Sequence, residues 1–132
     1  MKIKGFTLME TMVVLVIIGV LATIGVAQYT AHREAVLDKE AIANLKLIQS
    51  AERIYKMEIG AYVAAADNTT VNSLLNLMLP QAGSRWNYKV DNVTTSPNAF
   101  IGKAQRVTKT NHVWCTNQSA STEEPYACDG SW

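Results

Sequence analysis

The sequence predicts an α+β protein in which one long N-terminal helix packs on a small antiparallel sheet. Two observations indicate this fold class. No proline occurs from Phe6 to Gly60, and apolar residues recur along this stretch at helical spacing. After Gly60 the pattern changes to short runs in which apolar and polar residues alternate, as they do in half-buried strands. A chain of 132 residues is long enough for one globular domain.

The first half of the predicted helix has the composition of a membrane segment. Residues Thr11 to Ala31 carry no charge, and about 20 such residues span a bilayer. One acid, Glu10, lies just inside the start of the apolar stretch. A charge at the centre of a membrane helix costs about 3 kcal/mol on insertion scales, so we predict a functional role for this carboxylate. Gly19 and Gly25 are predicted either to loosen the helix or to allow close packing of neighbouring helices.

The second half of the helix is predicted to be amphipathic and to end at Gly60. Charged residues lie between the apolar positions, and Glu52 and Lys56 have the i,i+4 spacing of an exposed ion pair. The complete helix would measure ~80 Å at about 1.5 Å per residue. The apolar stripe that packs on the sheet is predicted to consist of Leu37, Ala41, Leu45, Ile48, Ala51, Tyr55 and Ile59.

Residues 61–132 are predicted to form a small α+β head. We expect a loop, a short helix that stops before Pro80, three strands and a C-terminal loop. The predicted bounds are Ala61 to Thr70 for the first loop, Val71 to Leu79 for the helix, Trp86 to Asp91, Ala99 to Val107 and Asn111 to Thr116 for the strands, Thr94 to Asn98 for the turn between the first two, and Asn117 to Trp132 for the last loop.

Cys115 and Cys128 are predicted to form a disulfide. If the N-terminal lysines stay in the cytoplasm by the positive-inside rule, the C-terminal part lies outside, where disulfides persist. A disulfide that closes such a small loop stabilises the folded protein by about 3 kcal/mol in the chain-entropy model. Two free thiols are the alternative. A metal site is disfavoured because no CxxC pair occurs and His112 is the only imidazole nearby.

Composition and motifs exclude several classes of function. The formal net charge is +1, without a basic stretch that would indicate nucleic-acid binding. We find no Ser-His-Asp set, no phosphate-binding loop and no cluster of metal ligands. The sequence therefore predicts neither an enzyme nor a bound cofactor.

The string Gly5-Phe6-Thr7-Leu8-Met9-Glu10 resembles the processing signature of type IV prepilins and type II secretion pseudopilins. The resemblance implies that prepilin peptidase cuts between Gly5 and Phe6, that Phe6 is then N-methylated, and that Glu10 helps to dock the subunit into a filament. Tyr55, Gly60 and Tyr62 also resemble the end of the long helix in that family. The expected organisation is a leader (1–5), a membrane and filament-core helix (6–31), the amphipathic half of that helix (32–60) and a pilin-like head (61–132).

Two other interpretations of the N-terminal segment compete with the prepilin interpretation. A cleaved secretory signal would use the small residues of Gly25-Val26-Ala27, and an uncleaved signal anchor would need only the apolar stretch. Neither gains from an acid at the depth of Glu10, whereas the prepilin interpretation gives it a partner. After cleavage the amine of Phe6 would lie close to a carboxylate, and pairing offsets the desolvation of both groups.

This chain departs from the family pattern in two respects. Many pilins of the type IVa class have a proline in the membrane half of the helix, and this chain has Ala27 nearby instead. Major pseudopilins commonly stabilise the head with calcium. Here the C-terminal loop has few acids and two cysteines, which favours a pilin. The acids of this loop are Glu123, Glu124 and Asp129.

The function expected from the resemblance is that of a structural pilus subunit. Its partners would be further copies of the chain, prepilin peptidase, the inner-membrane assembly machinery and, before assembly, the membrane itself. It would be held in the inner membrane as a single-pass precursor and then polymerise into an extracellular filament. The alternatives are a pseudopilin of a type II secretion or competence system and a monomeric membrane-anchored binding module.

Overall fold

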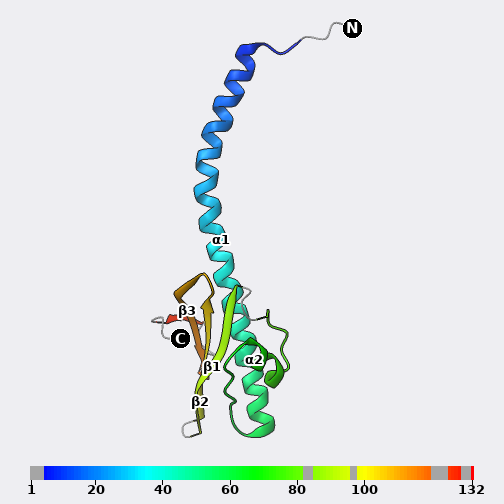
Figure 1. Ribbon diagram of the computed structural model, residues 1–132, viewed down its shortest axis with the longest axis vertical. Helices are drawn as coiled ribbons and strands as arrows, with labels where there is room; N and C mark the ends of the chain where they lie inside the picture. Colours follow the sequence, from blue (N-terminus) through cyan, green and yellow to red (C-terminus); the bar gives the residue numbers. More distant parts are fainter. Residues whose placement is uncertain (1–4, 82–84, 96–97, 120–124, 129–131) are drawn as a thin grey trace. The chain divides into compact units, whose positions relative to one another are not determined.

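The computed structural model describes residues 5–81, 85–95, 98–119, 125–128 and 132. Two compact units, Met1–Asp38 and Lys39–Trp132, are described separately below. The helix α1, Leu8–Ile59, contributes to both units (Figure 1). The predicted long helix and small antiparallel sheet are therefore confirmed, although α1 starts two residues after Phe6.

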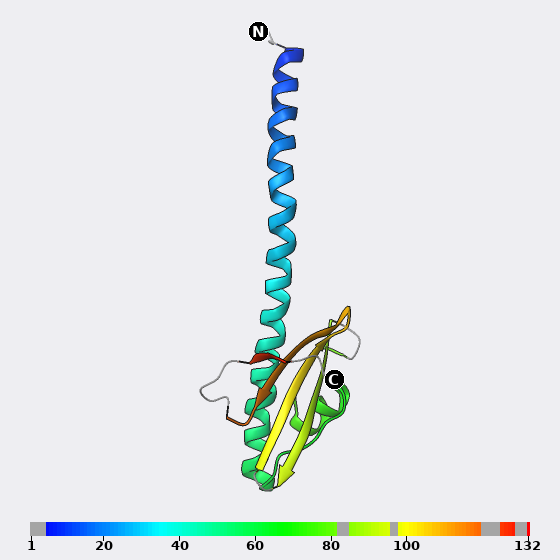
Figure 2. The ribbon, with the colours of Figure 1, turned by 90° about the vertical axis from the view of Figure 1, so that its left-hand side faces the viewer.

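Unit 39–132 contains the head and the C-terminal part of α1. Four strands form one antiparallel sheet in the order β1-β2-β3-β4, so each strand pairs with its neighbour in sequence. Figure 2 shows this sheet beside the C-terminal part of α1. The elements of the head are α2 (Asn68–Leu75), β1 (Trp86–Thr95), β2 (Asn98–Arg106), β3 (Lys109–Asn117) and β4 (Tyr126–Cys128).

The end of α1 agrees with the prediction. Gly60 follows the last helical residue with φ +89°, a backbone conformation that side chains rarely adopt. Its N–H donates to the carbonyl of Lys56 at 2.8 Å, which satisfies one of the last helical acceptors. Gly60 therefore ends the helix, as its position in the sequence predicts.

The short helix α2 lies three to four residues earlier than predicted. The Asp67 carboxylate accepts the Thr70 N–H at 2.8 Å and caps its start. Asn76, with φ 50° and ψ 42°, ends the helix in the left-handed conformation. The helix therefore ends several residues before Pro80, which the sequence predicts as its stop. Asn72 then holds the following turn, since its side chain exchanges two hydrogen bonds with the backbone of Leu79.

The core of the head lies between the sheet, α2 and the part of α1 from residue 39 on. Gly102 in β2 allows close packing, because a Cβ atom at that position would lie only 3.0 Å from Cγ2 of Thr116, in addition to ordinary contacts of 3.7 Å with Leu45 and Ile48. The Tyr62 ring packs against the Phe100 ring in a tilted arrangement, with ring centroids 4.7 Å apart. The largest fully buried apolar side chains are Leu45, Ile48, Val71, Trp86, Tyr88, Val90 and Phe100.

The apolar stripe of α1 differs from the prediction at its C-terminal end. Ala41, Leu45 and Ile48 are fully buried as expected, but Ile59 is 63% exposed. The buried face instead continues to Glu52, which is completely buried although the sequence predicts it on the exposed side. At about 100° per residue, positions 45, 48 and 52 lie within about 40° of Ala41 around the helix, whereas position 51 lies about 80° away. Ile59 returns to the angle of Ala41, but it is the last residue of α1.

The sheet contains one more strand than the sequence predicts. Tyr126–Cys128 pairs with Val113–Cys115 in a stretch expected to be loop. A strand of three residues has no detectable alternation, so no sequence pattern distinguishes it from a loop. β1 is also longer than predicted, because it continues past an irregularity between Asp91 and Thr94. Residues 96–97 of the predicted turn lie outside the described residues.

Candidate functional site

The structure reveals a cap at the start of α1 that the sequence analysis did not identify. The Thr7 side-chain oxygen lies 3.3 Å from the Glu10 backbone nitrogen, which donates to it, and the Thr7 carbonyl accepts from the same nitrogen at 3.1 Å. Thr7-Leu8-Met9-Glu10 therefore matches the S/T-x-x-E pattern of a helix N-terminus. This pattern would have placed the helix start at Leu8 from the sequence alone.

Gly5 and Phe6 precede this cap in exposed backbone without regular secondary structure. The Phe6 side chain is 82% exposed. A peptide bond outside a helix, between exposed residues, is accessible to a protease because no helical hydrogen bonds must first be broken. The preceding residues of the predicted leader, including Lys2 and Lys4, lie outside the described residues.

Glu10 lies in the first turn of α1, and its side chain is exposed. A carboxylate at this end of a helix is favoured by the helix dipole, although by less than about 1 kcal/mol at an exposed site. The carboxylate has no ion-pair partner among residues 5–81 and the other described ranges.

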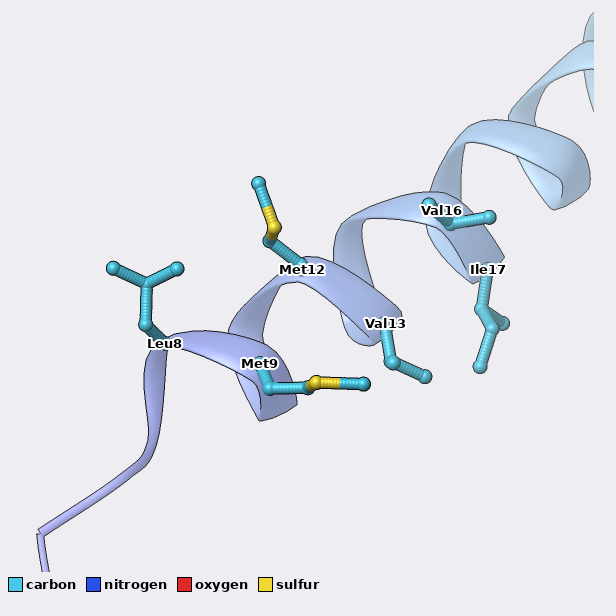
Figure 3. Close-up of a pocket in the computed structure, with 6 residues that line it drawn as sticks. All are labelled: Leu8, Met9, Met12, Val13, Val16 and Ile17. Carbon is cyan, nitrogen blue, oxygen red and sulfur yellow. The ribbon is translucent and has the colours of Figure 1, made fainter.

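The apolar half of α1 is exposed at every position whose burial the structure describes. The helix is long and apolar enough to cross a membrane, and none of its most apolar 18-residue stretch is buried within the structure. Figure 3 shows two rows of side chains with a spacing of four residues. Such rows are the ridges that fit into the grooves of a second helix. They are formed by Leu8, Met12 and Val16, and by Met9, Val13 and Ile17, and together they line an open groove of about 370 Å³.

Gly19 and Gly25 lie on the same exposed helix. A Cβ atom added at either position would meet no other atom within 4 Å, so neither glycine is required by packing inside the chain. The Thr23 hydroxyl donates to the Gly19 carbonyl at 2.9 Å, a bond that tends to bend helices slightly. Helix flexibility and close packing with neighbouring helices stay predictions for these residues.

The predicted disulfide between Cys115 and Cys128 is confirmed. The two Cα atoms are 5.8 Å apart, and the bond ties the short strand β4 to β3. Cys115 is buried, as is Val113, which pairs with Cys128. The acids of the C-terminal loop, Glu123, Glu124 and Asp129, lie outside the described residues.

His112 packs against two tryptophan side chains. Its ring lies 5.9 Å from that of Trp86 and 6.2 Å from that of Trp114, and Trp114 Nε1 donates to His112 Nε2 at 3.3 Å. Within the described ranges, no group of three or more histidine, cysteine, aspartate or glutamate side chains is placed to hold a metal ion. The candidate functional site is therefore the N-terminal segment.

Comparisons with known proteins match this segment. Residues 1–26 match the family model of the prokaryotic N-terminal methylation motif. The N-terminal segment therefore carries this methylation motif. The match includes Gly5, Phe6 and Glu10, and therefore confirms the resemblance on which the sequence analysis relied.

The similarity to individual relatives extends further along the chain. Competence protein ComGC of Streptococcus pneumoniae is 44% identical over 57 residues, which cover 43% of this chain and 53% of that protein. Type II secretion system core protein G of Escherichia coli is 33% identical over 87 residues, 65% of this chain and 59% of the relative. Type IV major pilin protein PilA of Myxococcus xanthus is 31% identical over 87 residues, which cover 66% of this chain and 36% of that protein.

These relatives include pilins and components of secretion and competence systems. The matched stretch covers less than two thirds of each of the three. No solved structure gives a significant match.

Proposed function

We propose that this chain is a pilin-like structural subunit that is cut between Gly5 and Phe6 and polymerises through its N-terminal helix into an extracellular pilus. The observation that carries the proposal is Glu10, a charged residue at the start of an exposed apolar helix that matches the methylation motif. A lone membrane anchor gains nothing from this acid. A filament supplies it with a partner, the amine that the cut creates on Phe6.

The pairing explains how one group can both drive assembly and fix its geometry. In the membrane, the carboxylate and the amine of a single subunit are poorly solvated. When a second subunit docks, the Glu10 of one subunit pairs with the Phe6 amine of the other, and both charges are compensated. Since the two groups lie near the same end of the helix, the pairing also defines the axial position of each new subunit.

The partners that the proposal requires are further copies of the chain, prepilin peptidase and an inner-membrane assembly machinery. Before assembly, the subunit would be held in the inner membrane by the apolar half of α1, which is long enough to span it. Gly19 and Gly25 would allow this half to loosen or to pack closely against its neighbours in the filament.

A pseudopilin of a secretion or competence system is the second candidate. It is favoured by the similarity to type II secretion system core protein G and to competence protein ComGC. The N-terminal chemistry would be the same, and the filament would be short and confined to the cell envelope. The disulfide of the C-terminal loop favours the pilus.

The proposal is tested by isolating sheared filaments from cells that produce the chain. Electron microscopy should show surface filaments, and intact-mass analysis should show a subunit that starts at Phe6 with one added methyl group. A subunit that starts at Gln28 would indicate ordinary secretion and overturn the proposal. Correct processing with filaments only in the envelope fraction would favour the pseudopilin.

A further inference from the structure

Unit 39–132 has an apolar groove between α1 and α2, which lies outside the apolar N-terminal half of α1. The two helices that form it are labelled in Figure 1. Its volume is about 390 Å³. The walls are Leu47 and Ile54 on α1 and Leu74 on α2, which are 52%, 54% and 37% exposed. Glu58 is the charged residue among those that line it.

The groove lies along a second apolar face of α1. Leu45 and Ile48 face the core. At about 100° per residue, Leu47 and Ile54 lie about 160° and 180° around the helix from Leu45, and about 100° and 120° from Ile48. A helix of a globular protein normally has one apolar stripe and a polar opposite face. The second face continues in steps of three and four residues and consists of Ala43, Leu47, Ser50, Ile54 and Met57.

The size of the groove restricts its occupant. A stable complex between two free proteins buries about 800 Å² on each partner. Three half-exposed side chains offer well below that area, so the groove cannot hold a free partner by itself. It is suited to a contact that is repeated in a polymer, where other contacts already hold the partner close and the effective concentration is high.

On the basis of the proposed function, we propose that this groove receives the apolar N-terminal helix of a second copy of the chain within the filament. That helix carries no charge from Thr11 to Ala31, and its side chains are exposed in each subunit. Its rows of side chains at a spacing of four residues are ridges of the kind that pack into grooves on the surface of another helix. Every subunit then brings both the groove and its occupant, so each added subunit buries two otherwise exposed apolar surfaces.

A photo-crosslinking amino acid at Ile54 tests the contact directly in assembled filaments. After irradiation, the crosslinked peptides are mapped by mass spectrometry. We expect Ile54 to crosslink to a peptide from residues 6–33 of another subunit. Crosslinks confined to residues 61–132 of another subunit, or none at all, would overturn the inference. If the probe at Ile54 prevents assembly, the same probe at Leu47 replaces it.

Charge substitutions give an independent measurement. Ile54→Asp and Leu47→Asp place a carboxylate in the groove, and because both side chains are half exposed the head should fold normally. We expect the membrane-held subunit to stay at the wild-type level and the filament yield to fall at least tenfold. Val107→Asp is the matched control, since Val107 is an exposed apolar residue outside the groove, and its yield should be unchanged.

The outcomes separate this inference from the proposed function. Wild-type yield from both groove variants, in filaments with a mature Phe6 terminus, would reject the groove contact and leave the pilin-like function intact. Failure of the wild-type chain to form any filament would reject both.

Discussion

The Glu52 side chain accepts a hydrogen bond from the backbone N–H of Val63 at 3.1 Å and ties the turn after α1 to the helix itself. The residue is fully buried, and within the described part of the chain Oε1 has no hydrogen-bond partner. Burial raises the pKa of this carboxyl from 4.5 to about 7, and the bond from Val63 offsets only part of the effect. A carboxylate in such a place makes stability depend on pH.

We predict that the head becomes less stable as the pH rises from 4.5 to 7. Because the folded pKa of Glu52 is raised, the folded state holds the proton more tightly than the unfolded state does. Its stabilising contribution is therefore complete below pH 4.5 and lost by about pH 7, a difference of about 3 kcal/mol in the free energy of unfolding. Urea denaturation of the detergent-solubilised chain, followed by tryptophan fluorescence, measures this.

Glu52→Gln is the matched control, because an amide can still accept from Val63 but does not titrate. Its stability should be nearly constant across the same range. Asp91 has a pKa that is lowered mainly by the hydrogen bond from Lys89 at 2.7 Å. Its stabilising contribution is present above pH 3.8 and is lost only at lower pH, outside this window. An equal loss of stability in Glu52→Gln would show that another group is responsible.

Glu52 also shows where prediction from the sequence fails. The positions of α1, of Gly60 at its end and of the three longer strands follow from the spacing of apolar residues and from the glycine and proline residues that bound each element. These are local properties of the sequence. Glu52 with Lys56 at i+4 has the local pattern of an exposed ion pair. Only the tertiary fold shows that the backbone of Val63 lies next to Glu52 and donates a hydrogen bond to it. Burial of this acid is decided by contacts across eleven residues, which no helical pattern contains.

The candidate site was more predictable than the head. Gly5, Phe6 and Glu10 are recognisable because their spacing forms a linear motif next to an apolar helix. The groove between α1 and α2 was not predictable, since it depends on α2 starting at its Asp67 cap and ending at Asn76. The sequence pattern placed that helix several residues later.

We predict that Gly102→Ala destabilises the head by about 1 kcal/mol. The added Cβ would lie 3.0 Å from Cγ2 of Thr116, which is closer than ordinary contact, and the core on that side is filled by Leu45 and Ile48. Overpacking of a filled core typically costs about 1–3 kcal/mol. The shift of the urea midpoint measures the effect.

A double-mutant cycle identifies the cause of this loss. Thr116→Ser removes the Cγ2 methyl group, so Gly102→Ala should cost less in that background than in the wild type. Equal costs in both backgrounds would mean that the strain arises elsewhere.

We predict that Cys128→Ser lowers the free energy of unfolding by about 3 kcal/mol, because the bond closes a loop between residues 13 apart in sequence. The strand β4 would be held only by its short pairing with β3, so protease cleavage near the C-terminus should become faster. Limited proteolysis and urea denaturation measure the two effects. Membrane insertion should be unchanged, and reduction of the wild-type chain should give the same shift. A reduced wild type as stable as the oxidised one would contradict the prediction.

The last prediction concerns Glu10 and separates a polymer subunit from a monomeric anchor. Glu10→Leu should keep the chain in the membrane and even favour it there, because removal of a charge from the apolar helix is stabilising. Filament yield should nevertheless collapse. The Phe6 amine of each subunit would enter the filament core without a partner, and an unpaired buried charge costs about 3–5 kcal/mol.

Two further variants assign the effect to the charge rather than to the shape of the side chain. Glu10→Gln keeps the size and loses the charge, so it should assemble as poorly as Glu10→Leu. Glu10→Asp keeps the charge with a shorter reach, and its yield should lie between those of Glu10→Gln and the wild type. The measurement is the ratio of sheared filament to membrane-held subunit for each variant. Wild-type yield from Glu10→Leu would remove the assembly role of the carboxylate, and the monomeric membrane-anchored module would then be the better description, because the loss of an acid with no partner would cost it nothing.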